Sequence, residues 1–168
     1  MTDAVAPGTR AAVMTCSNRS ARGERPDDSG AILAKGLAGM GFSVDGPIVV
    51  PDSVDEIQRA IGNALTSGAA LVVTTGGTGV TPTDVTPEAT RPLLDREIPG
   101  MAEALRLSAY DRVPTSVLSR GMVGLIGGSL VVNLPGSPGG VRDGLAVLGP
   151  LIGHVLSQAR GGDHHYHQ

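Results

Sequence analysis

The chain of 168 residues has the size of one domain, and its 40% hydrophobic residues are enough to form a core. The net charge of −3, with two tyrosines, one phenylalanine and no tryptophan, disfavours a nucleic-acid partner, which needs a basic face or stacking aromatics. The single cysteine, Cys16, excludes an internal disulfide and suits a reducing compartment. We expect one cytoplasmic domain over 1–168 with a core over about 8–158. We expect no membrane span, because glycines and prolines interrupt the uncharged stretch 121–141.

The N-terminal part of the sequence predicts a strand, a loop and a helix. A short apolar run over 10–17 is typical of a buried strand. The polar segment 18–27, with Gly and Pro, indicates a loop. Apolar residues at helical spacing begin after Asp28, and Gly39 and Gly41 end the predicted helix.

A second strand, a helix and a third strand follow. The apolar run 42–50 predicts a strand that Gly46-Pro47 makes irregular or places at a sheet edge. A capping box over 53–56 predicts a helix to about residue 67. The run 70–75 is apolar on both faces, as strands of parallel sheets are.

The second half of the chain begins with a glycine loop over 76–79. Thr86 is expected to cap a helix that has Pro87 in its first turn. A further helix is predicted from Pro99 to about residue 109, and a short one over 114–120.

The C-terminal third predicts a hairpin and a long helix. Residues 123–126 and 130–133 form two short apolar runs around a Gly127-Gly128 turn. The last helix begins at Pro138 or Gly139 and ends near residue 159, and we expect a mobile tail over 161–168.

The alternation of strands and helices predicts an open, mostly parallel α/β sheet with helices on both faces. Ligands of such sheets bind at the carboxyl ends of the strands. The polar segments of this chain follow predicted strands, so they should meet along one edge of the sheet. These segments are 17–18, 51–52, 76–84 and 133–137.

The glycine loop, Thr75-Gly76-Gly77-Thr78-Gly79, is a candidate anion-binding segment. Glycine backbone amides can approach an anion closely, and the threonine hydroxyls add donors. The alternative is a glycine-rich turn without a ligand.

Two acids flank the same predicted edge. Asp52 and Asp84 would suit Mg²⁺, which usually keeps several waters and shares the phosphates of a substrate. The alternative is helix capping, by Asp52 together with Ser53 and by Asp84 for the helix after Val85.

The remaining polar positions carry weaker signals. In the turn 133–138, Pro135 and Gly136 could point backbone amides outward, or the turn is a plain connector. Ser119-Arg120 offers a hydroxyl and a guanidinium, or an arginine that covers a helix end. Ser108 on its own indicates little.

Two further side chains are predicted to have no catalytic role. Cys16 is expected to be a small buried hydrophobe, and His154 to have a surface or packing role.

Several segments together resemble the molybdopterin-binding family of molybdenum-cofactor biosynthesis, over about residues 8–158. The resemblance implies a three-layer α/β sandwich and a homotrimer. It implies adenylylation of molybdopterin by Mg²⁺-ATP with release of pyrophosphate, and a molybdenum insertase as downstream partner. The segments are VPD (50–52), TTGGTGVTPTDVTPEAT (74–90), REIPGM (96–101), VLSRG (117–121) and SLVVNLPGSP (129–138).

The resemblance also implies roles for single residues. Asp52 and Asp84 correspond to the essential acids of the family. Other positions match those used around the pterin and its phosphate. They are Gly76, Gly77, Thr78, Ser108, Ser119 and Asn133, with Ser17 and Ser29 as further matches.

Two positions depart from the family pattern. Many members have an acid where Asn18 stands, and often a cation where Thr83 stands. If that acid helps to hold a metal, Asn18 weakens the site, and if it only caps a loop, nothing changes. Thr83 removes one phosphate contact. The alternatives to an enzyme are therefore a non-catalytic molybdopterin-binding or interaction protein of the same pathway, and an unrelated nucleotide-binding structural protein.

Overall fold

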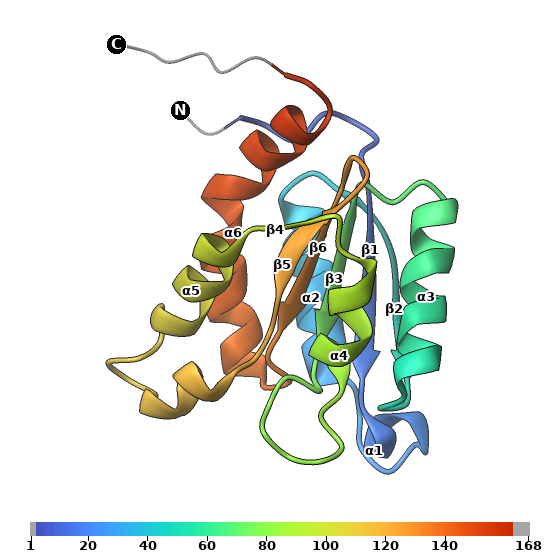
Figure 1. Ribbon diagram of the computed structural model, residues 1–168, viewed down its shortest axis with the longest axis vertical. Helices are drawn as coiled ribbons and strands as arrows, with labels where there is room; N and C mark the ends of the chain where they lie inside the picture. The colour runs from blue at the N-terminus through green and yellow to red at the C-terminus, as the bar shows by residue number, and fades with distance from the viewer. Residues whose placement is uncertain (1–2, 163–168) are drawn as a thin grey trace.

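A six-stranded sheet with helices on both faces forms the protein, and the computed structural model describes residues 3–162 (Figure 1). The strands are β1 (Arg10–Cys16), β2 (Ser43–Val50), β3 (Leu71–Thr75), β4 (Arg96–Glu97), β5 (Val123–Ile126) and β6 (Ser129–Leu134). The helices are α1 (Asn18–Ala21), α2 (Asp28–Gly39), α3 (Val54–Thr66), α4 (Thr86–Thr90), α5 (Pro99–Leu107) and α6 (Pro138–Ala159). Two short 3₁₀ helices are η1 (Arg91–Leu93) and η2 (Pro114–Leu118).

The sheet has the strand order β2-β1-β3-β6-β5-β4. The first four of these strands are parallel to one another, and β5 and β4 are antiparallel additions at one edge. The strands β5 and β6 form the predicted hairpin around Gly127-Gly128. The mostly parallel sheet with a small hairpin in the C-terminal third is therefore confirmed.

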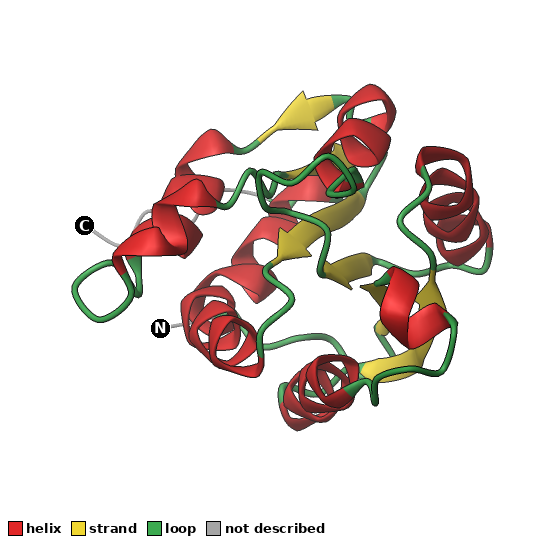
Figure 2. Ribbon diagram, turned by 90° about the horizontal axis from the view of Figure 1, so that it is seen from below, coloured by secondary structure: helices red, strands yellow, loops and turns green. Residues whose placement is uncertain are grey.

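The core lies in two layers, one on each face of the sheet. Ala11 and Val13 of β1 point into the layer covered by α2 and α6, while Ala12 and Met14 point into the layer covered by α3 and α4. This alternation follows from the period of two along a strand. Figure 2 shows helices on either side of the strands, which confirms the three-layer sandwich.

The edge strand β2 is irregular, as the sequence predicts. The Gly46-Pro47 peptide bond is cis, and the pairing of β2 with β1 shifts register near this point. Gly46 has φ +103°, and a Cβ there would lie 2.5 Å from the carbonyl oxygen of Val13. Only glycine fits this approach of two backbones.

Two local predictions need correction, and one short strand was not predicted. Thr86 is not a helix cap: Val85 holds that position without a side-chain bond, because the Thr86 hydroxyl donates to the carbonyl of Gly76 at 2.9 Å. The predicted loop 18–27 contains the one-turn helix α1, which Ser17 caps by accepting from the amide of Ser20. The two-residue strand β4 has no signal in the sequence and forms by pairing with β5.

Residues 1–2 and 163–168 lie outside the described residues, and with them most of the predicted tail. Within residues 3–162, none of the helices is long and apolar enough to cross a membrane.

Candidate active site

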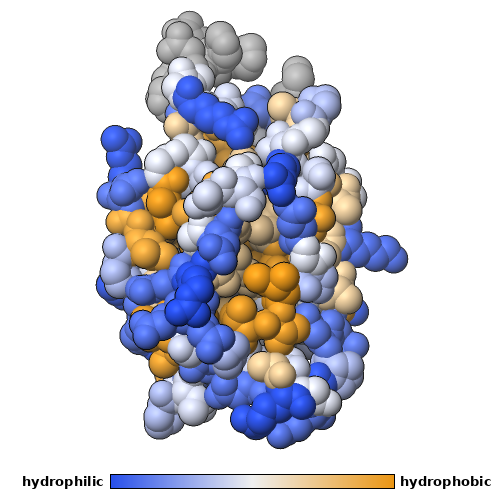
Figure 3. All heavy atoms as spheres, turned by 90° about the vertical axis from the view of Figure 1, so that its right-hand side faces the viewer, coloured by the Kyte–Doolittle hydropathy of each residue, from blue (hydrophilic) through white to orange (hydrophobic). Residues whose placement is uncertain are grey.

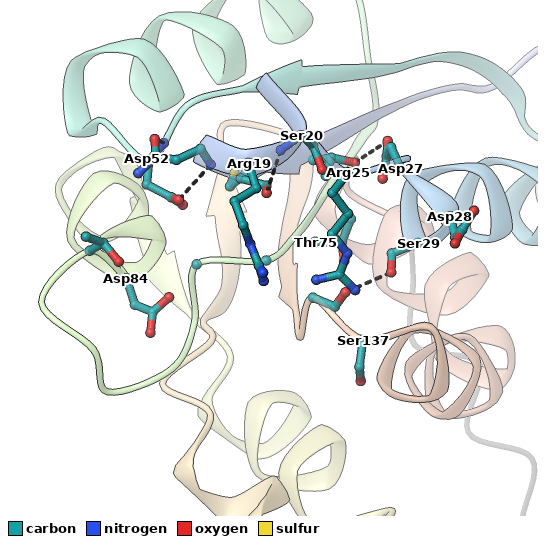
Figure 4. A pocket seen from close by; sticks show the side chains of 18 of the residues that line it. Arg19, Ser20, Arg25, Asp27, Asp28, Ser29, Asp52, Thr75, Asp84 and Ser137 are labelled. Carbon is teal, nitrogen blue, oxygen red and sulfur yellow. Dashed lines mark hydrogen bonds between the residues drawn. The ribbon is translucent and has the colours of Figure 1, made fainter. Parts of the chain in front are cut away.

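A polar cleft of about 440 Å³ lies at the carboxyl ends of the parallel strands (Figure 4). Its walls come from the segments that follow β1, β2, β3 and β6. The expectation that these segments meet at one edge is confirmed. The predicted site residues that line this cleft are Ser17, Asp52, Thr75, Gly76, Gly77, Asp84 and Gly136.

Glycine is required at two positions of the loop after β3. Gly76 has φ +96° and a Cβ there would lie 2.3 Å from the carbonyl oxygen of Cys16. Gly77 has φ +65° and a Cβ would lie 2.3 Å from the hydroxyl of Thr86. Among residues 3–162, no group accepts a hydrogen bond from the amides of Gly77, Thr78 and Gly79. The loop therefore has unsatisfied N–H donors of the kind an anion needs, and Gly77 is the one of these three residues that lines the cleft.

Arg120 braces this loop from outside the cleft. Its backbone N–H donates to the carbonyl of Thr78, its Nε to that of Gly79, and its Nη2 to that of Asp84, each at 2.8 Å. Its Nη1 pairs with the carboxylate of Glu88, which holds the pKa of Glu88 below its usual range. Arg120 thus does not merely cover a helix end. It ties both halves of the loop to α4.

Asp52 is held by a reciprocal pair of bonds with Asn18. The amide of Asn18 donates to Asp52 Oδ2 at 3.0 Å, and the amide of Asp52 donates to Asn18 Oδ1 at 2.9 Å. Asn18 here uses only its oxygen, so an aspartate would serve this bond as well. The geometry favours the interpretation in which the residue at position 18 organises a loop.

The second oxygen of Asp52, Oδ1, is buried and has no donor within residues 3–162. Burial raises the pKa of Asp52, the bond from the Asn18 amide lowers it, and the nearby charge of Asp84 raises it further. Figure 4 shows Asp52 and Asp84 on the same side of the cleft. A carboxylate whose pKa is raised in part by the charge of a second carboxylate marks a place where a cation would relieve repulsion.

Helix capping does not account for either carboxylate. Ser53, not Asp52, caps α3, with the Glu56 amide donating to its hydroxyl at 3.5 Å. Asp84 Oδ2 accepts from the amide of Thr81 at 3.0 Å and from the Thr81 hydroxyl at 2.7 Å. Asp84 therefore closes the loop on itself and caps no helix.

No ready-made metal cage is present in the part of the chain that the structure describes: no three or more His, Cys, Asp or Glu side chains cluster there. Asp52 and Asp84 fit a different mode, in which a hard divalent cation takes one or two carboxylates and completes its shell with water and ligand phosphates. The Oδ1 atom of Asp52 accepts no hydrogen bond within residues 3–162, which supports this fit.

A second, more apolar hollow of about 500 Å³ adjoins the cleft. Val113, Leu118 and Pro135 contribute to its walls. Both hollows are lined by Gly77, Asp84, Gly136 and Ser137, so they meet at Asp84. Four more predicted site positions line this hollow, namely Thr78, Gly79, Ser119 and Pro135.

Ser108 and Asn133 lie apart from both hollows, around a small space of about 40 Å³ beneath α5. Asn133 is 2% exposed. Its amide donates to the hydroxyls of Thr74 and Thr90 at 3.0 and 3.1 Å, and its oxygen accepts from the amide of Met122 at 3.1 Å. The Ser108 hydroxyl donates to the carbonyl of Leu105 at 2.9 Å. Their contact with a ligand stays a prediction.

Three other residues have structural surroundings. The hydroxyl of Ser29 donates to the carbonyl of Gly136 at 2.8 Å and joins α2 to the turn after β6. Burial raises the pKa of Cys16 to about 12, so its thiol stays neutral, as expected of a buried hydrophobe. His154 lies on α6 with Nδ1 2.9 Å from Asp3 Oδ2, a surface contact as predicted.

The sequence analysis missed two arginines that line the cleft, and for Arg120 it left open whether the guanidinium serves the site or covers a helix end. Arg19 and Arg25 line the polar cleft, and Arg120 braces its loop. Arg120 had a signal, because it directly follows a predicted site serine. For Arg19 and Arg25 the single signal is their place in a polar segment after a strand.

The fold and the cleft define an α/β domain of the kind in which ligands bind at the carboxyl ends of the parallel strands. Residues 12–154 match the family described as probable molybdopterin binding domain, and the chain belongs to this family. A molybdopterin adenylyltransferase of Pyrococcus furiosus is 40% identical over 153 residues, which cover 88% of this chain and 89% of that protein.

Two further comparisons agree. A molybdenum cofactor biosynthesis bifunctional protein of Synechococcus elongatus is 39% identical over 94% of this chain, which spans 49% of that protein. The crystal structure of a molybdopterin biosynthesis protein from Mycobacterium abscessus superposes with a TM-score of 0.86 at 48% identity. That similarity covers 90% of this chain and 96% of the other.

Proposed function

We propose that the protein acts in molybdenum cofactor biosynthesis and transfers the adenylyl group of ATP to molybdopterin, with release of pyrophosphate. One observation carries the proposal: in a chain of this family, two half-buried carboxylates and a glycine loop whose amides make no hydrogen bond within residues 3–162 lie together where the polar cleft meets the adjoining hollow. The relatives that carry the name molybdopterin adenylyltransferase support it.

Asp52 and Asp84 are the residues that would hold Mg²⁺. When bound, this ion neutralises charge on the triphosphate of ATP. Asn18 keeps Asp52 in place through both of its bonds, and Arg120 keeps the backbone of Asp84 in place. The carboxylates thus need little reorganisation when the nucleotide arrives.

The glycine loop would hold the attacking phosphate of molybdopterin through the amides of Gly77, Thr78 and Gly79. The adjoining apolar hollow offers walls for a planar ring. Other residues enter the proposal as substrate contacts in the two hollows, namely Ser17, Thr75, Gly76, Ser119, Pro135 and Gly136. Ser108 and Asn133 enter it through the family resemblance alone.

The transfer needs no strong base, because the nucleophile is a phosphate that is already anionic. One of its oxygens forms a bond to the α-phosphorus of ATP while the bond to the bridging α,β-oxygen breaks. That oxygen keeps the electron pair and leaves with pyrophosphate. The protein contributes alignment and charge neutralisation.

A non-catalytic molybdopterin-binding protein is the second candidate. The observation that favours it is Thr83, whose hydroxyl lies 3.2 Å from that of Thr81 and supplies no charge beside Asp84.

The test is direct. The purified protein is incubated with molybdopterin, ATP and Mg²⁺, and adenylylated pterin and pyrophosphate are measured beside Asp52→Asn and Asp84→Asn variants. We expect product from the wild type alone, with molybdopterin still bound by both variants. Bound molybdopterin without product in the wild type would favour the second candidate, and full activity in either variant would remove its carboxylate from the mechanism.

We extend the proposal to a single-domain, cytoplasmic homotrimer that delivers its product to a molybdenum insertase. Light scattering of the purified protein tests the trimer.

A further inference from the structure

Two arginines reach into the polar cleft without a hydrogen-bond or ion-pair partner among residues 3–162. Arg19 lies on α1 and Arg25 on the loop that follows it, and both line the cleft. Figure 4 shows both side chains extending in the same direction into the cleft. Within residues 3–162, neither guanidinium makes a hydrogen bond or an ion pair. Arg22, between them in the sequence, is instead paired with Glu24 at 2.7 Å.

Among the described residues, neither arginine forms an ion pair, although carboxylates are near: the charge of Arg19 acts on Glu24, and Asp28 lines the same cleft. Asp27 also lines the cleft, but its oxygens accept from the Thr15 hydroxyl at 2.7 Å and the Gly30 amide at 2.9 Å. That carboxylate is therefore used to hold the start of α2. The guanidinium donors remain free for a ligand that enters the cleft.

The charges of the cleft are separated in space. In Figure 4, Arg19 and Arg25 lie toward the middle of the cleft, with Asp52 and Asp84 on one side of them and Asp27 and Asp28 on the other. A ligand that reaches from Asp52 and Asp84 to the arginines should bind a cation at one end of its anionic group and guanidiniums at the other. A polyphosphate chelated by a divalent cation fits this description, because the cation occupies one end of the phosphate chain and the other end keeps anionic oxygens for the guanidiniums.

We propose that Arg19 and Arg25 form a diphosphate-binding subsite that holds the β- and γ-phosphates of the nucleotide. The assignment of the diphosphate to ATP rests on the proposed function. A diphosphate has two phosphoryl groups, one for each guanidinium, and planar guanidinium groups bind phosphate oxygens in pairs. A monophosphate would leave one arginine unpaired.

The position of the subsite agrees with the direction of transfer. In an in-line displacement, the attacking and leaving oxygens lie on opposite sides of the phosphorus. The glycine loop supplies one wall of the cleft, and the segment that carries Arg19 and Arg25 supplies another. When the bond from the α-phosphorus to the bridging oxygen breaks, the electron pair stays on the departing pyrophosphate. The two arginines stabilise that charge.

The first experiment measures binding of magnesium pyrophosphate by calorimetry, without molybdopterin. The variants are Arg19→Ala, Arg25→Ala and the double variant, with Arg22→Ala as the matched control from the same segment. We expect each single change to weaken binding by about tenfold, the double change by about a hundredfold, and the control by less than about twofold. Circular dichroism and unfolding temperature verify that each variant folds.

Two further probes identify the source of the phosphate. AMP carries the α-phosphate without the diphosphate, and the double variant should bind it as tightly as the wild type does. Inorganic phosphate can engage only one arginine, so in the double variant it should lose much less affinity than magnesium pyrophosphate does. The inference is overturned if the double variant binds magnesium pyrophosphate normally, if the wild type does not bind it, or if AMP or inorganic phosphate loses affinity equally.

The outcome is separable from that of the proposed function. Arginine-dependent binding of pyrophosphate and ATP, without formation of adenylylated pterin, would keep the subsite and reject the transferase. Product formation with a KM for ATP that the double variant leaves unchanged would keep the transferase and reject the subsite.

Discussion

Asp52 is half-buried, and its ionised form is disfavoured by burial and by the charge of Asp84. A carboxyl whose pKa is raised in the folded state binds a proton more tightly there than in the unfolded chain. Folding stability therefore falls as the pH rises from the unfolded value of about 3.9 through the raised folded value, and the deficit is complete above it.

Asp52→Asn should lack this loss of stability. The unfolding temperature of the variant minus that of the wild type, without divalent cations, should increase as the pH rises from about 4 and then level off. The substitution also buries an amide where Oδ1 of Asp52 lies, at a cost that does not depend on pH. Because the comparison uses the change of the difference with pH, this constant cost cancels. Thermal unfolding at a series of pH values measures it. A difference that stays constant or decreases with pH would contradict the assignment of the raised pKa.

Gly77 makes a second prediction at the scale of a residue. Gly77→Ala would place a Cβ 2.3 Å from the Thr86 hydroxyl and 3.1 Å from Asp52 Oδ1, at a φ of +65°. We expect a loss of about 1–3 kcal/mol of folding stability and loss of transfer activity. Urea unfolding measures the first of these effects.

The matched control for this change is Gly62→Ala in the middle of α3, where a Cβ would meet nothing within 4 Å. It should stabilise the protein by up to about 1 kcal/mol and leave the activity unchanged. Equal stability of Gly77→Ala and the wild type would show that the loop does not need its left-handed backbone.

At the scale of elements, the loop between β3 and α4 depends on Arg120. Arg120→Ala removes the bonds to the carbonyls of Gly79 and Asp84. We expect faster hydrogen exchange over residues 77–84 and about a tenfold higher Mg²⁺ requirement for transfer, because Asp84 is no longer positioned. Arg120→Lys should restore only part of both, since a lysine cannot reach several carbonyls with a fixed fork.

Arg91→Ala is the matched control for the loss of an exposed arginine. Its Nη1 lies 4.0 Å from Glu97, and within residues 3–162 its side chain makes no hydrogen bond to the loop between β3 and α4. It should leave the hydrogen exchange and the Mg²⁺ requirement as they are. An unchanged Mg²⁺ requirement in Arg120→Ala, with faster exchange, would make Arg120 a purely structural residue.

The elements that could be predicted from the sequence are those whose signal is local. Short apolar runs separated by helical patterns predict β1, β3 and α3, and their alternation predicts the parallel sheet. The pairing of β4 with β5 depends on residues far apart in the chain, so two residues alone cannot predict it. The role of Thr86 likewise depends on a tertiary contact, since its hydroxyl bonds the loop in place of the helix end.

The same distinction holds for the site. Asp52, Asp84 and the glycine loop follow strands, and strand ends meet at one edge, so their meeting could be predicted. Whether an arginine of this segment faces solvent or the cleft depends on how α1 and the loop after it pack. No local sequence pattern predicts that packing. Arg19 and Arg25 were therefore beyond sequence reasoning. The full internal bonding of Asn133 was also beyond it, because its partners come from β3, α4 and the segment before β5.

At the scale of the whole molecule, the sheet is protected unequally at its two edges. The edge formed by β4 is short, whereas β2 is an eight-residue edge strand. Figure 3 shows hydrophobic side chains gathered on the face that carries β2 and α3. Ile48 and Val49 are 48% and 38% exposed, and a groove of about 390 Å³ lies between β2 and α3. A long edge strand with apolar neighbours is a liability for a lone subunit.

The proposed homotrimer would cover this face, and this makes a prediction about where the copies meet. A threefold assembly has heterologous contacts, so the face over β2 and α3 would meet a different surface of the next copy. Ile48→Lys places a charge in the centre of the face, and burying it in a contact without a partner carries a large desolvation cost. We expect the variant to be monomeric by light scattering at concentrations where the wild type is a trimer, with an unchanged circular dichroism spectrum. Ile48→Leu, which keeps the size and apolar character, should stay trimeric. A trimer that tolerates Ile48→Lys would place the contacts elsewhere on the molecule.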